Sequence, residues 1–226
     1  MARRLILKED QLTSSFNPPV GYKSIGYNGL TFSERQSNGD IVPIGGSNTN
    51  TNEWTYDLGQ YVSDKGGVIF HRYKDGVNEN YLVVSINNIS TSSVWSNINN
   101  VAIGATAESL WDGLSNSNAI VGQGSASGAA VSCLAYSVGA IDDWYLPAVD
   151  ELSLLWHNRF NVNRTLFGSS SFGTIVGAIE IGYNNYWSST ERSNINAWYF
   201  SFDGGYVNPT GKNSAAYVRA VRKFSL

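Results

Sequence analysis

Cysteine is almost absent from this chain of 226 residues, because Cys133 is the only one. A single cysteine excludes an intrachain disulfide framework and any zinc site built from several cysteines. The chain has two histidines and no G-x-S-x-G motif, which argues against the usual serine hydrolase arrangement. The glycines at Gly122 and Gly124 lack the preceding strand and the following Lys-Ser/Thr pair of a phosphate-binding loop.

Charge is also scarce. Charged residues make up 15% of the chain, with 15 basic and 18 acidic residues and a net charge of −3. This balance gives no attraction to nucleic acid, so we expect no nucleic-acid partner. No apolar run approaches the roughly 18 residues of a membrane span, so we expect no membrane insertion. Arg3 and Arg4 precede an apolar stretch too short for a signal peptide, and we expect synthesis in a reducing compartment.

The first 46 residues differ from the remainder of the chain. They contain three of the five prolines and no tryptophan. Asn28-Gly29 is a strong hairpin signal between short apolar pieces at residues 22–25 and 30–32. This segment is too poor in apolar residues to fold well alone. We therefore expect residues 1–46 to form a β-rich anchoring or oligomerisation arm, followed by a flexible polar linker at residues 47–53.

Residues 54–226 are predicted to form one α+β domain, because helical patterns precede a run of strands. Two strands are expected at residues 66–71 and 81–85, separated by a turn at residues 74–76. Helices are expected from an N-cap at Thr106, over residues 127–138, and from Pro147 to about Arg159. From Tyr183 onward the pattern changes to short aromatic strands with Asn/Gly turns.

Two sequence blocks in this domain carry a specific resemblance. They are Asp143-Trp144-Tyr145-Leu146-Pro147-Ala148-Val149-Asp150-Glu151-Leu152 and Tyr186-Trp187-Ser188-Ser189-Thr190-Glu191. Further matching segments lie at residues 66–70, 81–84, 129–133, 197–198, Phe202 and 218–222. The domain resembles the C-terminal domain of the collagen-like bacterial adhesin Lcl, also found in Bacteroidetes and phage surface proteins. The resemblance implies a C-type-lectin-like fold, related to that of formylglycine-generating enzymes. It also implies that Trp144, Leu146, Leu152, Trp187 and Val218 are buried.

Residues 183–224 resemble the variable region of proteins that phage and bacterial retroelements diversify. In such regions, fixed scaffold positions alternate with residues reachable by mutating adenines in Asn codons. The scaffold positions here are Trp187, Trp198, Phe202, Lys212, Val218 and Arg219. The alternating positions are Ser193, Asn194, Asn196, Tyr199, Ser201, Asp203, Tyr206, Asn208, Asn213, Ser214, Ala216 and Tyr217.

The composition of this region independently favours a recognition surface. Tyrosine supplies a large amphipathic contact area at low entropic cost, and Ser, Gly and Asn supply adaptable hydrogen bonds, as in antibody paratopes. A turn-rich edge of a β domain would have a similar composition and stays open as the structural alternative. The predicted ligand-binding residues are Asn196, Trp198, Tyr199, Ser201, Asp203, Tyr206, Asn208, Asn213 and Tyr217.

Residues 17–29 are similar to the start of small phage virion proteins such as head or tail fibres. Fibres of this kind are usually symmetric homotrimers, so the resemblance implies a trimer. The expected partners are further copies of the chain, a virion capsid or tail protein bound through residues 1–46, and a host-surface glycan or protein. The expected location is the virion surface, after synthesis in the host bacterial cytoplasm.

Catalytic and metal-binding alternatives are weaker. Formylglycine-generating enzymes use a pair of thiols, whereas Cys133 is alone and is predicted to be a core residue. His71 and His157 are predicted to be packing or surface residues. Asp142, Asp143, Asp150 and Glu151 invite a metal or acid–base site, but within the family they are scaffold positions. The Glu-Pro-Asn and Trp-Asn-Asp motifs of calcium-dependent lectins are absent, so we expect no metal and no cofactor.

The sequence therefore predicts a non-enzymatic phage fibre or decoration protein whose C-type-lectin-like domain binds a ligand through a variable C-terminal face. A bacterial cell-surface adhesin of the same fold is the main alternative. An enzyme related to formylglycine generation is the less favoured third hypothesis.

Overall fold

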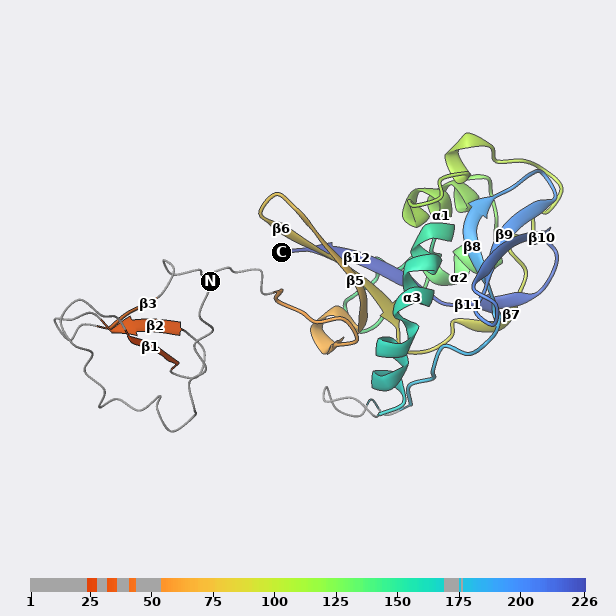
Figure 1. The fold of residues 1–226 in the computed structure, drawn as a ribbon. Coiled ribbons are helices and arrows are strands. Elements are labelled where there is room, and N and C mark those ends of the chain that lie inside the picture. Colours follow the sequence, from red (N-terminus) through yellow and green to blue (C-terminus); the bar gives the residue numbers. More distant parts are fainter. Residues whose placement is uncertain (1–23, 28–31, 36–40, 44–53, 169–174, 176) are drawn as a thin grey trace, which may run out of the picture. The chain divides into compact units, whose positions relative to one another are not determined.

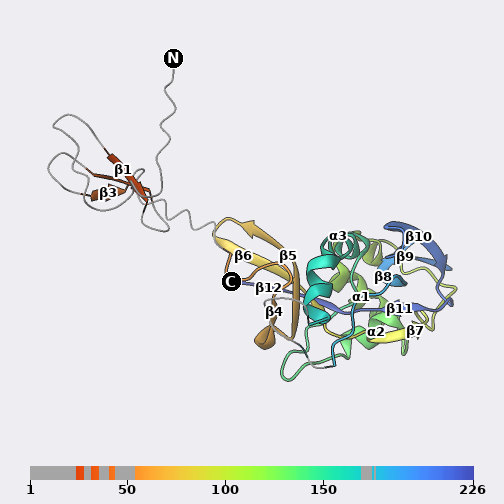
Figure 2. The same cartoon turned by 60° about the horizontal axis from the view of Figure 1, so that its bottom comes forward.

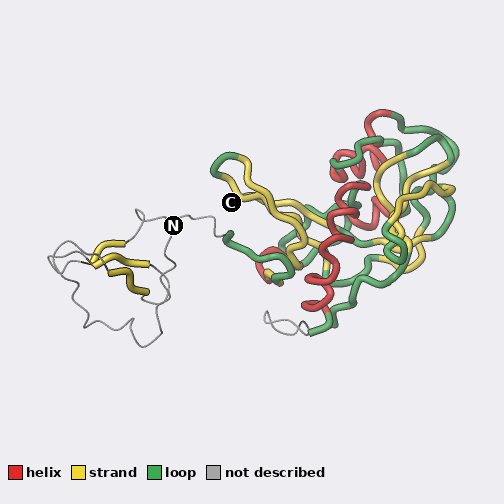
Figure 3. The backbone as a smooth tube through the Cα atoms, viewed as in Figure 1, coloured by secondary structure: helices red, strands yellow, loops and turns green. Residues whose placement is uncertain are grey.

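A computed structural model of the chain describes residues 24–27, 32–35, 41–43, 54–168, 175 and 177–226 (Figure 1). The chain divides into two compact units, Met1–Trp54 and Thr55–Leu226. The first unit contains three short strands, drawn in yellow in Figure 3. They are β1 (Ser24–Tyr27), β2 (Phe32–Arg35) and β3 (Ile41–Pro43), which form an antiparallel sheet in the order β1-β2-β3.

The hairpin predicted at Asn28-Gly29 is confirmed by the pairing of β1 with β2. Tyr27 lies opposite Phe32, so the two strands flank the predicted turn. The turn residues themselves and the predicted linker at residues 47–53 lie outside the described residues.

In the second unit, one antiparallel sheet has the strand order β12-β6-β5-β4. Its strands are β4 (Tyr61–Val62), β5 (Gly67–Asp75), β6 (Asn78–Ser85) and β12 (Val221–Ser225). The strands predicted at residues 66–71 and 81–85 are confirmed, and both extend further toward the turn that joins them. Because β4 and β12 share this sheet, both ends of the second unit are held in one layer.

A second sheet has the order β10-β9-β8-β11-β7. Its strands are β7 (Ser90–Ser93), β8 (Asn185–Glu191), β9 (Asn196–Ser201), β10 (Tyr206–Gly211) and β11 (Ala216–Val218). Strand β11 runs parallel to β8, and the other neighbours are antiparallel. The aromatic strands predicted from Tyr183 onward are therefore confirmed.

The prediction of a helix capped by Thr106 is wrong. Thr106 lies in a single 3-10 turn, η3 (Ala105–Ala107), and helix α1 (Gly113–Gly122) begins later. The Ser109 hydroxyl accepts a hydrogen bond from the Asp112 N–H at 3.0 Å, which favours a turn over a continuous helix. Asp112 then caps α1, because its carboxylate accepts the Ser115 N–H at 2.9 Å.

Helix α2 (Ala129–Leu134) is shorter than the predicted span of residues 127–138. It begins directly after Gly128, whose φ of +127° favours glycine. A Cβ atom at this position would lie 2.6 Å from the Trp95 carbonyl oxygen, so the backbones approach too closely for any other residue. Elsewhere in the domain, a second 3-10 turn, η2 (Ser63–Lys65), connects strand β4 to strand β5 of the first sheet.

Helix α3 (Val149–Leu166) lies between the two sheets, as Figures 1 and 2 show. It contacts β5 on one side and β8 and β9 on the other. The helix was expected to end at about Arg159, but Val162 and Leu166 continue its buried stripe and extend it by two turns. The predicted core residues Trp144, Leu146, Leu152, Trp187 and Val218 are all fully buried, so this prediction is confirmed.

Glu151 joins α1 to α3. Its Oε2 accepts the Ala148 N–H at 2.8 Å and the Gly113 N–H at 3.2 Å, and its Oε1 accepts the Tyr145 hydroxyl at 2.6 Å. The bond to Ala148 is half of a capping box at the start of α3. Burial raises the pKa of Glu151 from 4.5 to about 7, and the three donors offset only part of this effect.

We predict that Leu152→Ala lowers the free energy of unfolding by about 2–5 kcal/mol, because it leaves a cavity between α3 and the sheets. Leu110→Ala is the matched control, since Leu110 is 52% exposed, and it should change stability by less than about 0.5 kcal/mol. Urea denaturation measures both values. Equal costs for the two variants would contradict the packing described above.

We also predict a pH dependence that depends on Glu151. A carboxyl group whose pKa is raised on folding binds its proton more tightly in the folded state, so stability falls as pH rises from 4.5 to about 7. Between pH 5 and 8 this contribution amounts to about 2 kcal/mol. Glu151→Gln removes the titration. Its amide oxygen can still accept the Ala148 and Gly113 N–H groups, and its NH2 group can donate to the Tyr145 hydroxyl in place of the bond that the carboxylate accepts. Its stability should therefore fall less than that of the wild type over this range, and parallel pH profiles would refute the assignment.

Candidate functional site

The hairpin of β9 and β10 contains most of the predicted ligand-binding residues. Its register places Tyr199 opposite Asn208 and Ser201 opposite Tyr206. Residues opposite each other in a sheet share a face, so Tyr199, Tyr206 and Asn208 lie on the same face. Tyr206 is 49% exposed, Asn208 is exposed and Tyr199 is half-buried. We call these three side chains the outer face of the hairpin.

The turn of this hairpin is fixed against α3. Gly205 has a φ of +69°, and a Cβ atom there would lie 2.4 Å from Cζ2 of Trp156. Trp156 Nε1 donates to the Phe202 carbonyl at 3.2 Å, and the Arg159 guanidinium lies 4.1 Å from the Trp156 ring centroid. The exposed side chain of Asp203 is therefore presented from a turn that is packed on a helix.

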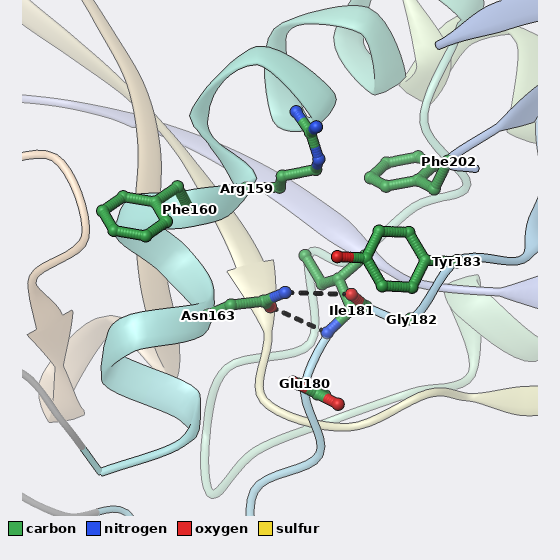
Figure 4. Close-up of a pocket in the computed structure, with 8 residues that line it drawn as sticks. All are labelled: Arg159, Phe160, Asn163, Glu180, Ile181, Gly182, Tyr183 and Phe202. Carbon is green, nitrogen blue, oxygen red and sulfur yellow. Dashed lines mark hydrogen bonds between the residues drawn. The ribbon is translucent and has the colours of Figure 1, made fainter. Parts of the chain in front are cut away.

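A groove of about 330 Å³ adjoins this turn (Figure 4). It is lined by Arg159, Phe160, Asn163, Glu180, Ile181, Gly182, Tyr183 and Phe202. Asn163 fixes its wall, since its side chain accepts the Ile181 N–H at 2.8 Å and donates to the Ile181 carbonyl at 2.9 Å. Figure 4 shows the Tyr183 hydroxyl directed toward α3. We call this feature the α3 groove.

Two aromatic rings of the α3 groove are exposed to solvent. Phe160 is 72% exposed and Tyr183 is 79% exposed. Exposed aromatic rings beside a cation and a carboxylate, here Arg159 and Glu180, are suited to holding an amphipathic ligand. The sequence-based prediction did not include Arg159 and Phe160 among the site residues, because only tertiary packing brings them beside Tyr183.

The structure does not bring all nine predicted residues together. Asn196 and Trp198 project from the face of β9 opposite to Tyr199. Ser201 is buried, so its side chain is not available to a ligand. Tyr217 is half-buried, with its ring centroid 5.6 Å from that of Tyr186 in the core. Asn213 is exposed in the connection between β10 and β11.

A buried ion pair lies beneath the hairpin. Lys212 Nζ is paired with the Glu191 carboxylate, and both side chains are completely buried. The carboxylate also accepts the N–H groups of Ile103 and Gly104, and Lys212 Nζ donates to the Val101 carbonyl at 3.1 Å. The pair thus ties the end of β8, the end of β10 and the loop at residues 101–104 together.

A family model described as the Lcl C-terminal domain matches residues 85–222, more than half of the chain. The chain belongs to the Lcl C-terminal domain family. The match runs from the last residue of β6 into β12 and includes α1, α2, α3 and the whole hairpin. The resemblance to the Lcl family stated from the sequence is thus confirmed. The comparison with curated proteins finds no match.

Several titratable groups near this Lcl C-terminal domain are buried or paired with other side chains. Cys133 is fully buried, as predicted, and burial raises the pKa of its thiol far above the usual value. Burial lowers the pKa of His71, which favours a neutral ring. Asp143 binds Arg222 through both carboxylate oxygens. Within the described residues, no three His, Cys, Asp or Glu side chains are grouped to hold a metal ion, and no helix could span a membrane.

For the Lcl C-terminal domain we predict that Lys212→Met costs about 3–5 kcal/mol of stability, because it leaves the Glu191 charge buried without its partner. The double variant with Glu191→Gln should be more stable than Lys212→Met alone. Lys74→Met is the control, since Lys74 pairs with Glu79 near the surface and should cost about 1 kcal/mol or less. Denaturation curves measure the free energy of unfolding of each variant. An equal loss of stability for Lys74→Met and Lys212→Met would contradict the role of the buried pair.

Proposed function

We propose that residues 54–226 are a C-type-lectin-like, non-enzymatic binding module that attaches a phage virion to a bacterial surface. The observation that carries this proposal is the outer face of the hairpin, where Tyr206 and Asn208 are exposed and Tyr199 is half-buried on strands whose connecting turn packs on α3. Such side chains provide broad contact area and adaptable hydrogen bonds. The α3 groove adds two exposed rings beside the same turn. The ligand is a host-surface glycan or protein.

The distribution of burial supports a variable recognition surface on a constant scaffold. Most of the scaffold positions within residues 183–224 are buried, namely Trp187, Phe202, Lys212, Val218 and Arg219. The alternating positions are mostly exposed or half-buried, with Ser201 and Ala216 as the buried exceptions. Substitutions at the accessible positions change contact chemistry at little cost to stability. We propose that residues 183–224 are diversified by a retroelement.

The second part of the proposal concerns whether a phage particle or a bacterial cell surface displays the module. The β-rich first unit is suited to anchoring on a virion capsid or tail protein. Membership of an adhesin-like family instead favours a bacterial cell-surface adhesin, which is the second candidate. Mass spectrometry of purified phage particles separates the two. Detection of the chain in particles supports the virion proposal, and its detection in bacterial envelopes alone supports the adhesin.

We predict that Tyr199→Ala combined with Tyr206→Ala greatly weakens binding to intact bacterial cells. Each aromatic anchor of a true hot spot contributes at least about 2 kcal/mol, which corresponds to about 30-fold in affinity. Cell binding of the fluorescently labelled full-length protein, tested on a panel of strains, measures the effect. Stability should fall only modestly, because Tyr206 is exposed and Tyr199 is half-buried.

Two controls accompany this double variant. Phe167→Ala removes a more exposed ring, 74% exposed against 49% for Tyr206, from the end of α3 and should leave binding unchanged. Tyr217→Ala should lower stability, since its ring packs on Tyr186. Unchanged binding by the Tyr199/Tyr206 variant would refute the proposed surface.

We predict further that the full-length protein is a homotrimer held partly by residues 1–46. Unpaired strand edges favour association with further copies, and a repeated weak site gains avidity. Light scattering should give three times the chain mass of 24.6 kDa for the full chain and a lower association state for a chain beginning at Asn52. A monomeric full-length protein at micromolar concentration would overturn the trimer.

A further inference from the structure

A second groove, of about 460 Å³, lies beside the first turns of α1 and α3. Its floor includes the buried residues Leu82, Tyr145 and Glu151. Its remaining lining residues are Tyr73, Trp111, Asp112, Leu114, Asp150, Leu154 and Lys223. Trp111 is 78% exposed, although an indole ring is usually among the most buried side chains. This groove shares no residue with the outer face of the hairpin or with the α3 groove.

Trp111 is an exposed tryptophan with no cation over its ring, whereas three other tryptophans of the domain each have one. Lys212 lies 4.8 Å from the ring centroid of Trp95, Arg159 lies 4.1 Å from that of Trp156, and Arg192 lies 5.6 Å from that of Trp198. Among the side chains of residues 54–168 and 177–226, none with a positive charge lies over Trp111. Its ring face is therefore available to a cation from outside the domain.

The charges in the groove complement such a cation. Asp112 and Asp150 are exposed carboxylates in its lining. The carboxylate of Asp112 is partly occupied, because it accepts the N–H and the hydroxyl of Ser115. Lys223 is the only cation in the lining, and its Nζ lies 5.2 Å from the Tyr73 ring centroid. The carboxylates thus outnumber the cation, and within residues 54–168 and 177–226 the Asp150 carboxylate has no hydrogen-bond or ion-pair partner.

We infer that this groove binds an arginine side chain of a partner polypeptide, with the guanidinium stacked on Trp111 and hydrogen-bonded to Asp150. The domain itself contains both interactions, an arginine over a tryptophan ring and an arginine paired with an aspartate. Arg159 and Arg192 stack on tryptophan rings, and Arg222 binds both oxygens of Asp143. A planar guanidinium can stack on an aromatic ring and at the same time donate two parallel N–H hydrogen bonds to a carboxylate. An ammonium group is not planar and cannot make both interactions in this way. The groove is large enough for one such side chain and its neighbouring backbone.

The test uses the full chain and a capped Gly-Arg-Gly peptide, followed by the NMR signals of the tryptophan indole N–H groups. Trp111→Phe identifies the Trp111 signal by its loss. The matched probe is Gly-citrulline-Gly, because citrulline keeps the planar shape and lacks the charge. We expect the arginine peptide to shift the Trp111 signal and the citrulline peptide to bind about tenfold more weakly or worse.

Substitutions of exposed residues test peptide binding without unfolding the domain. Trp111→Ala, followed through the backbone amide signals of the groove residues Asp112 and Leu114, should weaken the arginine peptide about tenfold. Asp150→Asn, followed through the Trp111 signal, should weaken it to a similar extent, and the other indole signals should stay unchanged in both variants. Asp142→Asn is the control, since Asp142 is an exposed carboxylate outside the groove, and it should have no effect. Three results would each overturn the inference: equal binding of citrulline, tighter binding of a Gly-Lys-Gly peptide or choline, or no shift of the Trp111 signal.

Discussion

The buried ion pair of Glu191 and Lys212 is the constraint on which the proposed recognition surface depends. Two opposite charges without solvent contact are stable only when each is fully hydrogen-bonded. Here the bonds reach the loop at residues 101–104, and the Lys212 backbone pairs with Trp95 and Ile195. The strands that carry the hairpin are therefore held at their ends. The hairpin can change its outer side chains without losing its position, because none of these bonds involves them.

The same principle applies at the other end of the hairpin. Gly205 packs on Trp156, and Trp156 is held by Phe202 and Arg159. Helix α3 in turn is anchored through Glu151 to α1 and through its apolar stripe to both sheets. A surface fixed at both ends loses less conformational entropy on binding, which favours affinity. The accessible tyrosines then contribute contact area and not stability.

Much of the fold could be predicted from the sequence, and the errors have physical causes. The strands and the buried tryptophans were predictable, because alternating aromatic residues and turn signals are local. The start of α1 was not, since Ser109 and Asp112 both bond nearby N–H groups and only the packed structure shows which one caps the helix. For the candidate site, composition identified the hairpin, but its register decides which side chains share a face. Side chains alternate along β9, so Trp198 lies on the other face of the strand from Tyr199, and Ser201 is buried. The α3 groove could not be predicted, because it joins Phe160 to Tyr183 through tertiary packing.

The central claim is that this domain binds its ligand through the hairpin and the adjoining α3 groove. Hydrogen–deuterium exchange of the full chain, free and bound to the envelope of a strain that it recognises, tests the claim most directly. We expect slower exchange on binding in β9, β10, the turn at Asp203 and residues 180–183, with β4, β5 and β6 unchanged. Protection confined to β1–β3 or to the sheet of β4, β5, β6 and β12 would contradict it.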